Sequence, residues 1–145
     1  MKPAHLLDTS ALLAHLLKEP GEDIVEHCLS AGGGRSAVSI VSWVEFQLII
    51  SRSNYPKADA QKIIGFYRDA VGVPLPIDAA VGNTAVTLRA LCPARIHLTD
   101  LLVAACAKNH GLKLVYRDKH IEGIPEKALL QIKLPPKDRI APRKG

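Results

Sequence analysis

Apolar residues along the chain fall into two patterns, short continuous runs and longer stretches with helical spacing. The short apolar run at 4–7 indicates a strand, and further stretches with β-like composition, which also contain polar residues or prolines, lie at 35–39, 73–77, 112–116 and 129–134. The stretches with apolar residues three or four positions apart indicate helices, and they lie at 10–18, 22–31, 41–52, 56–70, 78–91 and 99–111. Because strands and helices alternate, we expect an α/β sandwich with a mostly parallel central sheet.

The length of the chain favours a single domain followed by a tail. A chain of 145 residues is long enough to bury one core, and it shows no internal repeat. We therefore predict one domain over 1–134. The remaining residues, 135–145, are rich in proline and positive charge and are predicted to form a flexible basic tail.

Composition argues against several classes of protein. No apolar run approaches the roughly 20 residues that cross a bilayer, so we expect a soluble cytoplasmic protein without a membrane partner. The three cysteines are odd in number and form no CxxC pair, which argues against a disulfide scaffold and a zinc site. The net charge of +5 suits a polyanion partner such as RNA, whereas 4% aromatic residues are too few for a base-stacking platform.

Four acidic residues stand in apolar surroundings. Asp8 directly follows the first predicted strand, and Asp118 follows the strand at 112–116. Since the carboxyl ends of parallel strands share one edge of the sheet, both carboxylates should lie there. Glu45 and Asp100 have apolar residues three and four positions further along their helices, so they should share the buried face or face a cleft.

Each of these acids also has an ordinary structural explanation. Asp8 and Asp100 could cap helices, which stabilises a helix by about 1 kcal/mol. Glu45 could pair with a buried arginine, and Asp118 could be a turn residue between two basic neighbours. The sequence offers no obvious buried cations opposite all four, however, which makes four separate explanations less economical than one shared site.

A shared site would be electrostatically costly without a cation. Two carboxylates about 5 Å apart repel by roughly 3 kcal/mol at an effective dielectric of 20. Four of them together rival the stability of a small domain, which is about 5–15 kcal/mol. Protons or a hard divalent cation must then relieve the repulsion, and oxygen ligands favour Mg²⁺ or Mn²⁺ over zinc.

Three segments of the sequence carry these acids. They are LLDTSALLAHLLKE at 6–19, VSWVEF at 41–46 and LTDLLVAACAKNHGLKLVYRDKHIEGIP at 98–125. In order and spacing they resemble a PIN domain, and specifically the VapC-type ribonuclease toxins of prokaryotic toxin–antitoxin pairs. The resemblance runs over about 4–130 and implies a PIN-like α/β/α sandwich for the predicted domain.

The resemblance also implies an activity and a set of site residues. It implies a Mg²⁺-dependent endoribonuclease toxin, with Mn²⁺ able to substitute, that leaves 5′-phosphate and 3′-hydroxyl ends. A cognate antitoxin and a homodimer are implied as partners. Ser10 and Thr99 would support the site by orienting a carboxylate or a water. The implied catalytic and metal-binding quartet is Asp8, Glu45, Asp100 and Asp118.

Basic residues near the acids would have to bind the phosphates of RNA. If the four acids lie in a cleft, the rest of the surface carries an excess of about nine positive charges. Arg117 and Lys119 flank Asp118 and are the preferred phosphate contacts. Three further candidates are Arg52, Lys57 and Arg95, and each of the five could equally be an ordinary solvated residue.

Two other functions stay open at the level of the sequence. The chain could be an RNA-processing nuclease of the same fold that has no antitoxin. It could also be a non-catalytic module whose acidic pocket docks a basic peptide. Four acids in apolar segments argue against the second alternative, because a binding module has no need for so many costly charges.

Overall fold

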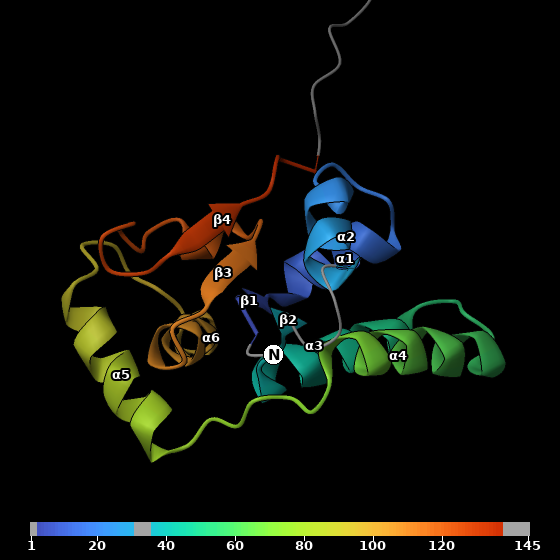
Figure 1. Ribbon diagram of the computed structural model, residues 1–145, viewed down its shortest axis with the longest axis horizontal. Helices are drawn as coiled ribbons and strands as arrows, with labels where there is room; N and C mark the ends of the chain where they lie inside the picture. Colours follow the sequence, from blue (N-terminus) through green and yellow to red (C-terminus); the bar gives the residue numbers. More distant parts are fainter. Residues whose placement is uncertain (1–2, 31–35, 138–145) are drawn as a thin grey trace, which may run out of the picture.

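The structure, a computed structural model, describes residues 3–30 and 36–137. In this part of the chain, four strands form one sheet in the order β2-β1-β3-β4, and every neighbouring pair is parallel (Figure 1). The strands are β1 His5–Leu7, β2 Ser36–Ala37, β3 Lys113–Tyr116 and β4 Gln131–Lys133. The predicted α/β class is therefore confirmed, and the sheet is parallel throughout the described residues.

Helices cover both faces of this sheet. They are α1 Thr9–Leu16, α2 Glu22–Ser30, α3 Ile40–Arg52, α4 Lys57–Val71, α5 Ala79–Ala90 and α6 Leu98–Asn109, with a short 3₁₀ helix, η1, at Lys119–Ile121. Helices α5 and α6 pack on one face, and α1 to α4 pack on the other (Figure 1). Each predicted helix is present, with ends within two residues of the predicted ones, and none of the described helices is long and apolar enough to span a membrane.

The short strands are buried on both faces. Successive strand residues point to opposite sides, so Leu6 and Leu114 enter the core beneath α5 and α6. Leu7 and Val115 enter the second core, beneath α1 to α4. All four side chains are fully buried, as expected for strands in the middle of a parallel sheet. This explains why the two central strands are mainly apolar in the sequence.

The strand predicted at 73–77 is not formed. Only Leu75 pairs with a neighbour, in an isolated bridge to Ser39, where its N–H donates to the Val38 carbonyl at 2.8 Å. Pro74 and Pro76 stand on either side of it, and proline has no N–H to donate to a ladder. Val73 is 88% exposed, so the segment behaves as an apolar loop beside the sheet.

The segment after β4 lies against the turn between α1 and α2. Gly21 in that turn has φ +96°, and a Cβ placed on it would lie 3.0 Å from Cδ of Pro135. Leu134 is buried, and Lys137 pairs with Glu19 at 3.3 Å. Of the predicted tail at 135–145, the first three residues thus lie close to the fold, while 138–145 fall outside the described residues.

Candidate metal and active site

Asp8 is placed at the carboxyl edge of the sheet by the end of β1. Its backbone N–H continues the strand pairing to the Val115 carbonyl at 3.0 Å, and its side chain then caps α1. The carboxylate is only 6% exposed. The pKa of Asp8 is raised from 3.8 to about 6, mainly by burial and to a smaller extent by the charges of Asp100 and Glu45, while hydrogen bonds from Ser10 act to lower it. Asp8 is therefore both a helix cap and a buried carboxyl group that is costly to ionise.

Ser10 connects the ends of two strands. Its hydroxyl donates to Oδ2 of Asp8 at 2.6 Å, and its N–H donates to the same oxygen at 3.2 Å. The hydroxyl oxygen in turn accepts the N–H of Arg117, just after β3, at 3.0 Å. Ser10 thus holds the Asp8 carboxylate at a fixed place relative to the β3–η1 loop.

Asp100 lies in the first turn of α6 and is half-buried. The cap of α6 is His97, without a side-chain hydrogen bond, so capping is not the reason for this acid. Burial raises the pKa of Asp100, and so do the nearby charges of Asp118 and Glu45. The charge of Asp100 in turn raises the pKa of Asp8. Asp100 is therefore electrostatically coupled to each of the other three predicted acids.

Asp118 follows β3 and forms a compact group with two histidines. Its Oδ1 accepts the N–H of His120 at 3.0 Å and lies 2.8 Å from Nδ1 of the same residue. One possible ligand atom each from Asp100, Asp118 and His120 lie within 4.8 Å of one another. The His97 and His120 rings meet edge to face at 4.7 Å between centroids. This group has the donor set and size of a divalent metal site.

Glu45 does not lie on the buried face of its helix, which was one of the two positions predicted for it. The buried face of α3 is formed by Ser42, Trp43, Phe46 and Ile50, and Glu45 is exposed. Helix α3 has apolar residues on more than one face, so apolar neighbours at helical spacing did not identify the core side. The charge of Glu45 nevertheless acts on both Asp8 and Asp100, which places it at the rim of the acid group.

The four predicted acids therefore gather at one edge of the sheet, which we call the acid cluster: Asp8, Glu45, Asp100 and Asp118. Thr99, predicted to support it, is exposed on the first turn of α6. The two histidines were not predicted as members. A usable signal was their spacing, since His97 precedes Asp100 by three residues and His120 follows Asp118 by two.

The five residues predicted to contact phosphate differ in exposure and in their ion pairs. The Arg117 guanidinium donates to Glu19 at 2.5 Å and to the Pro20 carbonyl at 3.0 Å, and its side chain is 12% exposed. Arg117 is thus committed to an internal ion pair, which corrects its placement as a preferred phosphate ligand. Lys119 is exposed immediately beside Asp118. The other three candidates, Arg52, Lys57 and Arg95, are exposed as well.

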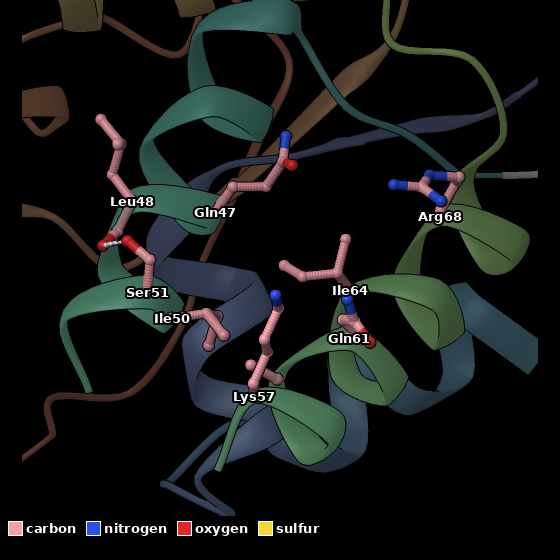
Figure 2. Close-up of a pocket in the computed structure, with 9 residues that line it drawn as sticks. Gln47, Leu48, Ile50, Ser51, Lys57, Gln61, Ile64 and Arg68 are labelled. Atoms are coloured by element: carbon pink, nitrogen blue, oxygen red, sulfur yellow. Dashed lines mark hydrogen bonds between the residues drawn. The ribbon is translucent and has the colours of Figure 1, made fainter. Parts of the chain in front are cut away.

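A separate hollow lies away from these strand ends. It is a groove of about 680 Å³ between α3 and α4, with Lys57 and Arg68 directed toward the space that Ile64 and Ile50 line (Figure 2). We call it the α3–α4 groove. Gln47, Ser51 and Gln61 complete its polar lining, and no acidic residue contributes to it. Lys57 belongs to this groove and not to the acid cluster.

The sequence also matches a known family. A family model described as PIN domain matches residues 5–127 of the chain. The chain belongs to the PIN domain family. PIN domains are nucleases that generally use divalent metals, which agrees with an acid cluster at the sheet edge. Among curated proteins, by contrast, no significant match was found for this chain.

Solved structures share the PIN fold of this chain at low sequence identity. A chain of VapBC2 from Rickettsia felis, bound to a DNA fragment from its promoter, superposes with TM-score 0.72 at 20% identity, covering 91% of this chain and 99% of that one. VapBC-5 from Mycobacterium tuberculosis, a toxin–antitoxin system, gives 0.66 at 20%, covering 90% and 98%. A toxin–antitoxin complex from Klebsiella pneumoniae gives 0.64 at 22%, covering 90% and 97%. Nearly the whole chain therefore has this fold.

Proposed function

We propose that this PIN domain is a VapC-type endoribonuclease toxin that hydrolyses RNA phosphodiester bonds with Mg²⁺, or with Mn²⁺ in its place. The observation that carries the proposal is the convergence of the acid cluster. Carboxyl groups from four segments far apart in the sequence influence one another, and the most buried of them, Asp8, has a pKa raised to about 6. Such an arrangement is unfavourable for folding alone and requires a cation to hold every carboxylate ionised.

The residues present fit a divalent cation. In the described part of the chain, no lysine or arginine lies within salt-bridge distance of any carboxylate in the acid cluster. The available donors are carboxylate oxygens with an imidazole at the edge, and hard cations prefer oxygen ligands. Asp8 and Asp100 are the proposed main ligands, and Asp118 and Glu45 are proposed to assist directly or through water.

The chain's own residues have separable tasks in the proposed hydrolysis. Ser10 holds the Asp8 carboxylate in one orientation, and burial of that carboxylate excludes water from one side of the site. Glu45 is exposed at the rim and can accept a proton from the attacking water. The bound cation would supply Lewis-acid stabilisation of the negative charge that develops on the phosphate.

A protein partner is part of this proposal. The toxin–antitoxin systems that share the fold support a cognate antitoxin for this chain, and a homodimer is proposed as well. Ile40, Val44 and Leu48 are exposed at four-residue spacing along one side of α3. An exposed apolar row of this kind suits a protein–protein contact, because it would otherwise face water.

The test is cleavage of RNA by the purified chain. We expect tRNA, rRNA or mRNA to be cut with Mg²⁺ or Mn²⁺ present, no cleavage in EDTA, and product ends with 5′-phosphates. Asp100→Asn should remove the activity without unfolding the protein, as checked by circular dichroism. Cleavage that persists in EDTA, or in Asp100→Asn, would contradict the site. Complete absence of metal-dependent cleavage would favour a non-catalytic module.

A further inference from the structure

A second concave surface adjoins the acid cluster at the same edge of the sheet. It has a volume of about 490 Å³ and lies between the ends of β3 and β4, and we call it the β3–β4 groove. Tyr116 of β3 pairs in register with Lys133 of β4, the last residue of its strand. Asp8 and Asp118 follow β1 and β3 at this edge, and neighbouring strands lie about 4.8 Å apart. The groove therefore lies beside the strand end that presents Asp118, and Asp8 lies at the end of the next strand, β1.

Positive charge dominates this groove. Arg117, Lys119, Lys133 and Lys137 line it, together with the acidic residue Glu122. Lys133 pairs with Glu122, while Arg117 and Lys137 both contact the single carboxylate of Glu19. Three of these four cations thus share two carboxylates. Within the described residues, Lys119 has no carboxylate within salt-bridge distance, so its charge is available to a ligand.

We infer that the β3–β4 groove binds the phosphates of RNA next to the one that is cleaved. This inference rests on the proposed function and adds the path that the substrate follows from the acid cluster. Lys119 adjoins Asp118 and would contact the nearest phosphate, and Lys133 and Lys137 would contact the phosphates beyond it. Lysine suits this task because its ammonium group binds phosphate as a point charge on a flexible stem.

The neighbouring acids explain why a cationic groove is needed here. RNA carries a negative charge at each nucleotide, so the acid cluster repels the strand that it must hold. Cations beside the cluster offset this repulsion and fix the strand, and the salt dependence of binding reflects how many phosphates they neutralise. The α3–α4 groove also has two cations, Lys57 and Arg68, but it is not formed by the strand ends that present Asp8 and Asp118.

Three double variants separate these surfaces, each with two positive charges removed. Lys119→Gln/Lys133→Gln changes the β3–β4 groove, and Lys57→Gln/Arg68→Gln changes the α3–α4 groove. Lys62→Gln/Lys127→Gln, at exposed positions outside both grooves, is the matched control. Each is made in Asp100→Asn, so that RNA is bound without being cut, and fluorescence anisotropy measures binding of a single-stranded RNA oligonucleotide over a range of KCl concentrations.

The β3–β4 variant should bind RNA about tenfold more weakly than its Asp100→Asn parent. Its slope of log affinity against log salt should be shallower by about 0.7 for each phosphate that the groove no longer neutralises. The other two variants should bind within about twofold of the parent. In the cleavage-competent chain, Lys119→Gln/Lys133→Gln should raise KM more than it lowers kcat, because the acid cluster is untouched.

Two results would overturn the inference while leaving the proposed function standing. One is a β3–β4 variant that binds RNA as tightly as its parent, with an unchanged salt slope, while the wild-type chain cleaves RNA. The other is normal RNA binding by that variant together with loss of binding to polyglutamate, which would assign the groove to an acidic protein. Failure of the wild-type chain to cleave any RNA contradicts the proposed function itself.

Discussion

The acid cluster and the α3–α4 groove are opposite kinds of surface. The acid cluster is a small group of carboxylates gathered from four segments, with Asp8 almost fully buried. The α3–α4 groove is a hollow of about 680 Å³, and its lining contains cations and apolar side chains but no acid (Figure 2). The presence of a hollow alone would have suggested the groove as the functional site. The carboxylates at the strand ends, which are unfavourable to bury, identify the acid cluster as the functional site instead.

Helix α3 shows how one element contributes to both. Glu45 influences Asp8 and Asp100, whereas Gln47, Leu48 and Ser51 line the groove. A gap between two helices arises wherever their side chains do not interlock, so a groove needs no functional explanation. Buried like charges do need one, because nothing in folding favours them. The predictions below test whether the two surfaces differ as this argument requires.

The largest difference should appear in catalysis. Asp100→Asn keeps the shape of the side chain and removes the carboxylate that is coupled to the other three acids, so we expect RNA cleavage to fall by about 10³-fold or more, the equivalent of about 4 kcal/mol. Lys57→Gln/Arg68→Gln in the α3–α4 groove should cleave within a few-fold of wild type. Initial rates on one RNA, with Mg²⁺ saturating, measure both. Equal losses in the two variants would remove the distinction between the surfaces.

The next difference concerns stability in the absence of metal. The unfolded chain releases the Asp8 proton near pH 3.8, whereas the folded carboxyl group holds it to about pH 6. Stability from this group is therefore present below about pH 4 and is lost as the pH rises to about 6, by up to about 3 kcal/mol. Asp8→Asn has no such loss, so in EDTA at pH 7.5 it should unfold at higher urea concentration than wild type.

A matched control distinguishes this effect from helix capping in general. Asp78 caps α5 by accepting the Val81 N–H at 3.0 Å, but it is exposed and lies outside the acid cluster. Asp78→Asn should therefore leave stability within about 0.5 kcal/mol of wild type at pH 7.5. If Asp8→Asn is no more stable than wild type in EDTA, Asp8 is not an unfavourable buried charge and the argument for a cation weakens.

Metal binding should stabilise the fold through the same carboxylates. Mn²⁺ or Mg²⁺ at about 100 times its dissociation constant should add about 2.7 kcal/mol to the free energy of unfolding at pH 7.5. The gain should shrink as the pH falls through about 6, because protonated Asp8 cannot bind a cation. Thermal unfolding of wild type with and without Mn²⁺ measures it, and Asp100→Asn should show little gain. A gain of similar size in both proteins would place the metal elsewhere.

The smallest expected effect is that of Ser10→Ala. The variant loses the 2.6 Å bond to Asp8 and the link to Arg117, which should lower the free energy of unfolding by about 1–2 kcal/mol. Because that bond lowers the pKa of Asp8, its loss should also move the acidic limb of the pH–rate profile to higher pH. Ser51→Ala, at an exposed serine lining the α3–α4 groove, should change neither quantity. An unchanged pH profile in Ser10→Ala would show that Ser10 does not position Asp8.

The elements of the fold were predictable where hydrophobic spacing alone determines them. Helices and buried strands have distinct apolar periods, so their positions followed from the pattern, and the parallel sheet then brought Asp8 and Asp118 to one edge. The segment at 73–77 failed because its two prolines remove the donors that a strand needs, although its apolar residues suggested one.

The details of the site depended on contacts that no local pattern contains. Arg117 is bound by Glu19, which lies 98 residues earlier in the chain, so its side chain could not be placed from its neighbours. The His97–His120 contact likewise requires the N-cap of α6 to meet η1, the short helix after β3. The sequence could not decide between the two positions predicted for Glu45, because α3 has apolar residues on several faces and only packing decides which face is covered.

The close approach at Gly21 has a practical consequence for engineering the chain. Because the glycine lies against Pro135 and Leu134, a version shortened before residue 134 would expose the α1–α2 turn and leave Glu19 without Lys137. Glu19 also holds Arg117, next to the loop that presents Asp118. Fusion proteins and purification tags are therefore best joined after residue 137, and not directly after the last strand.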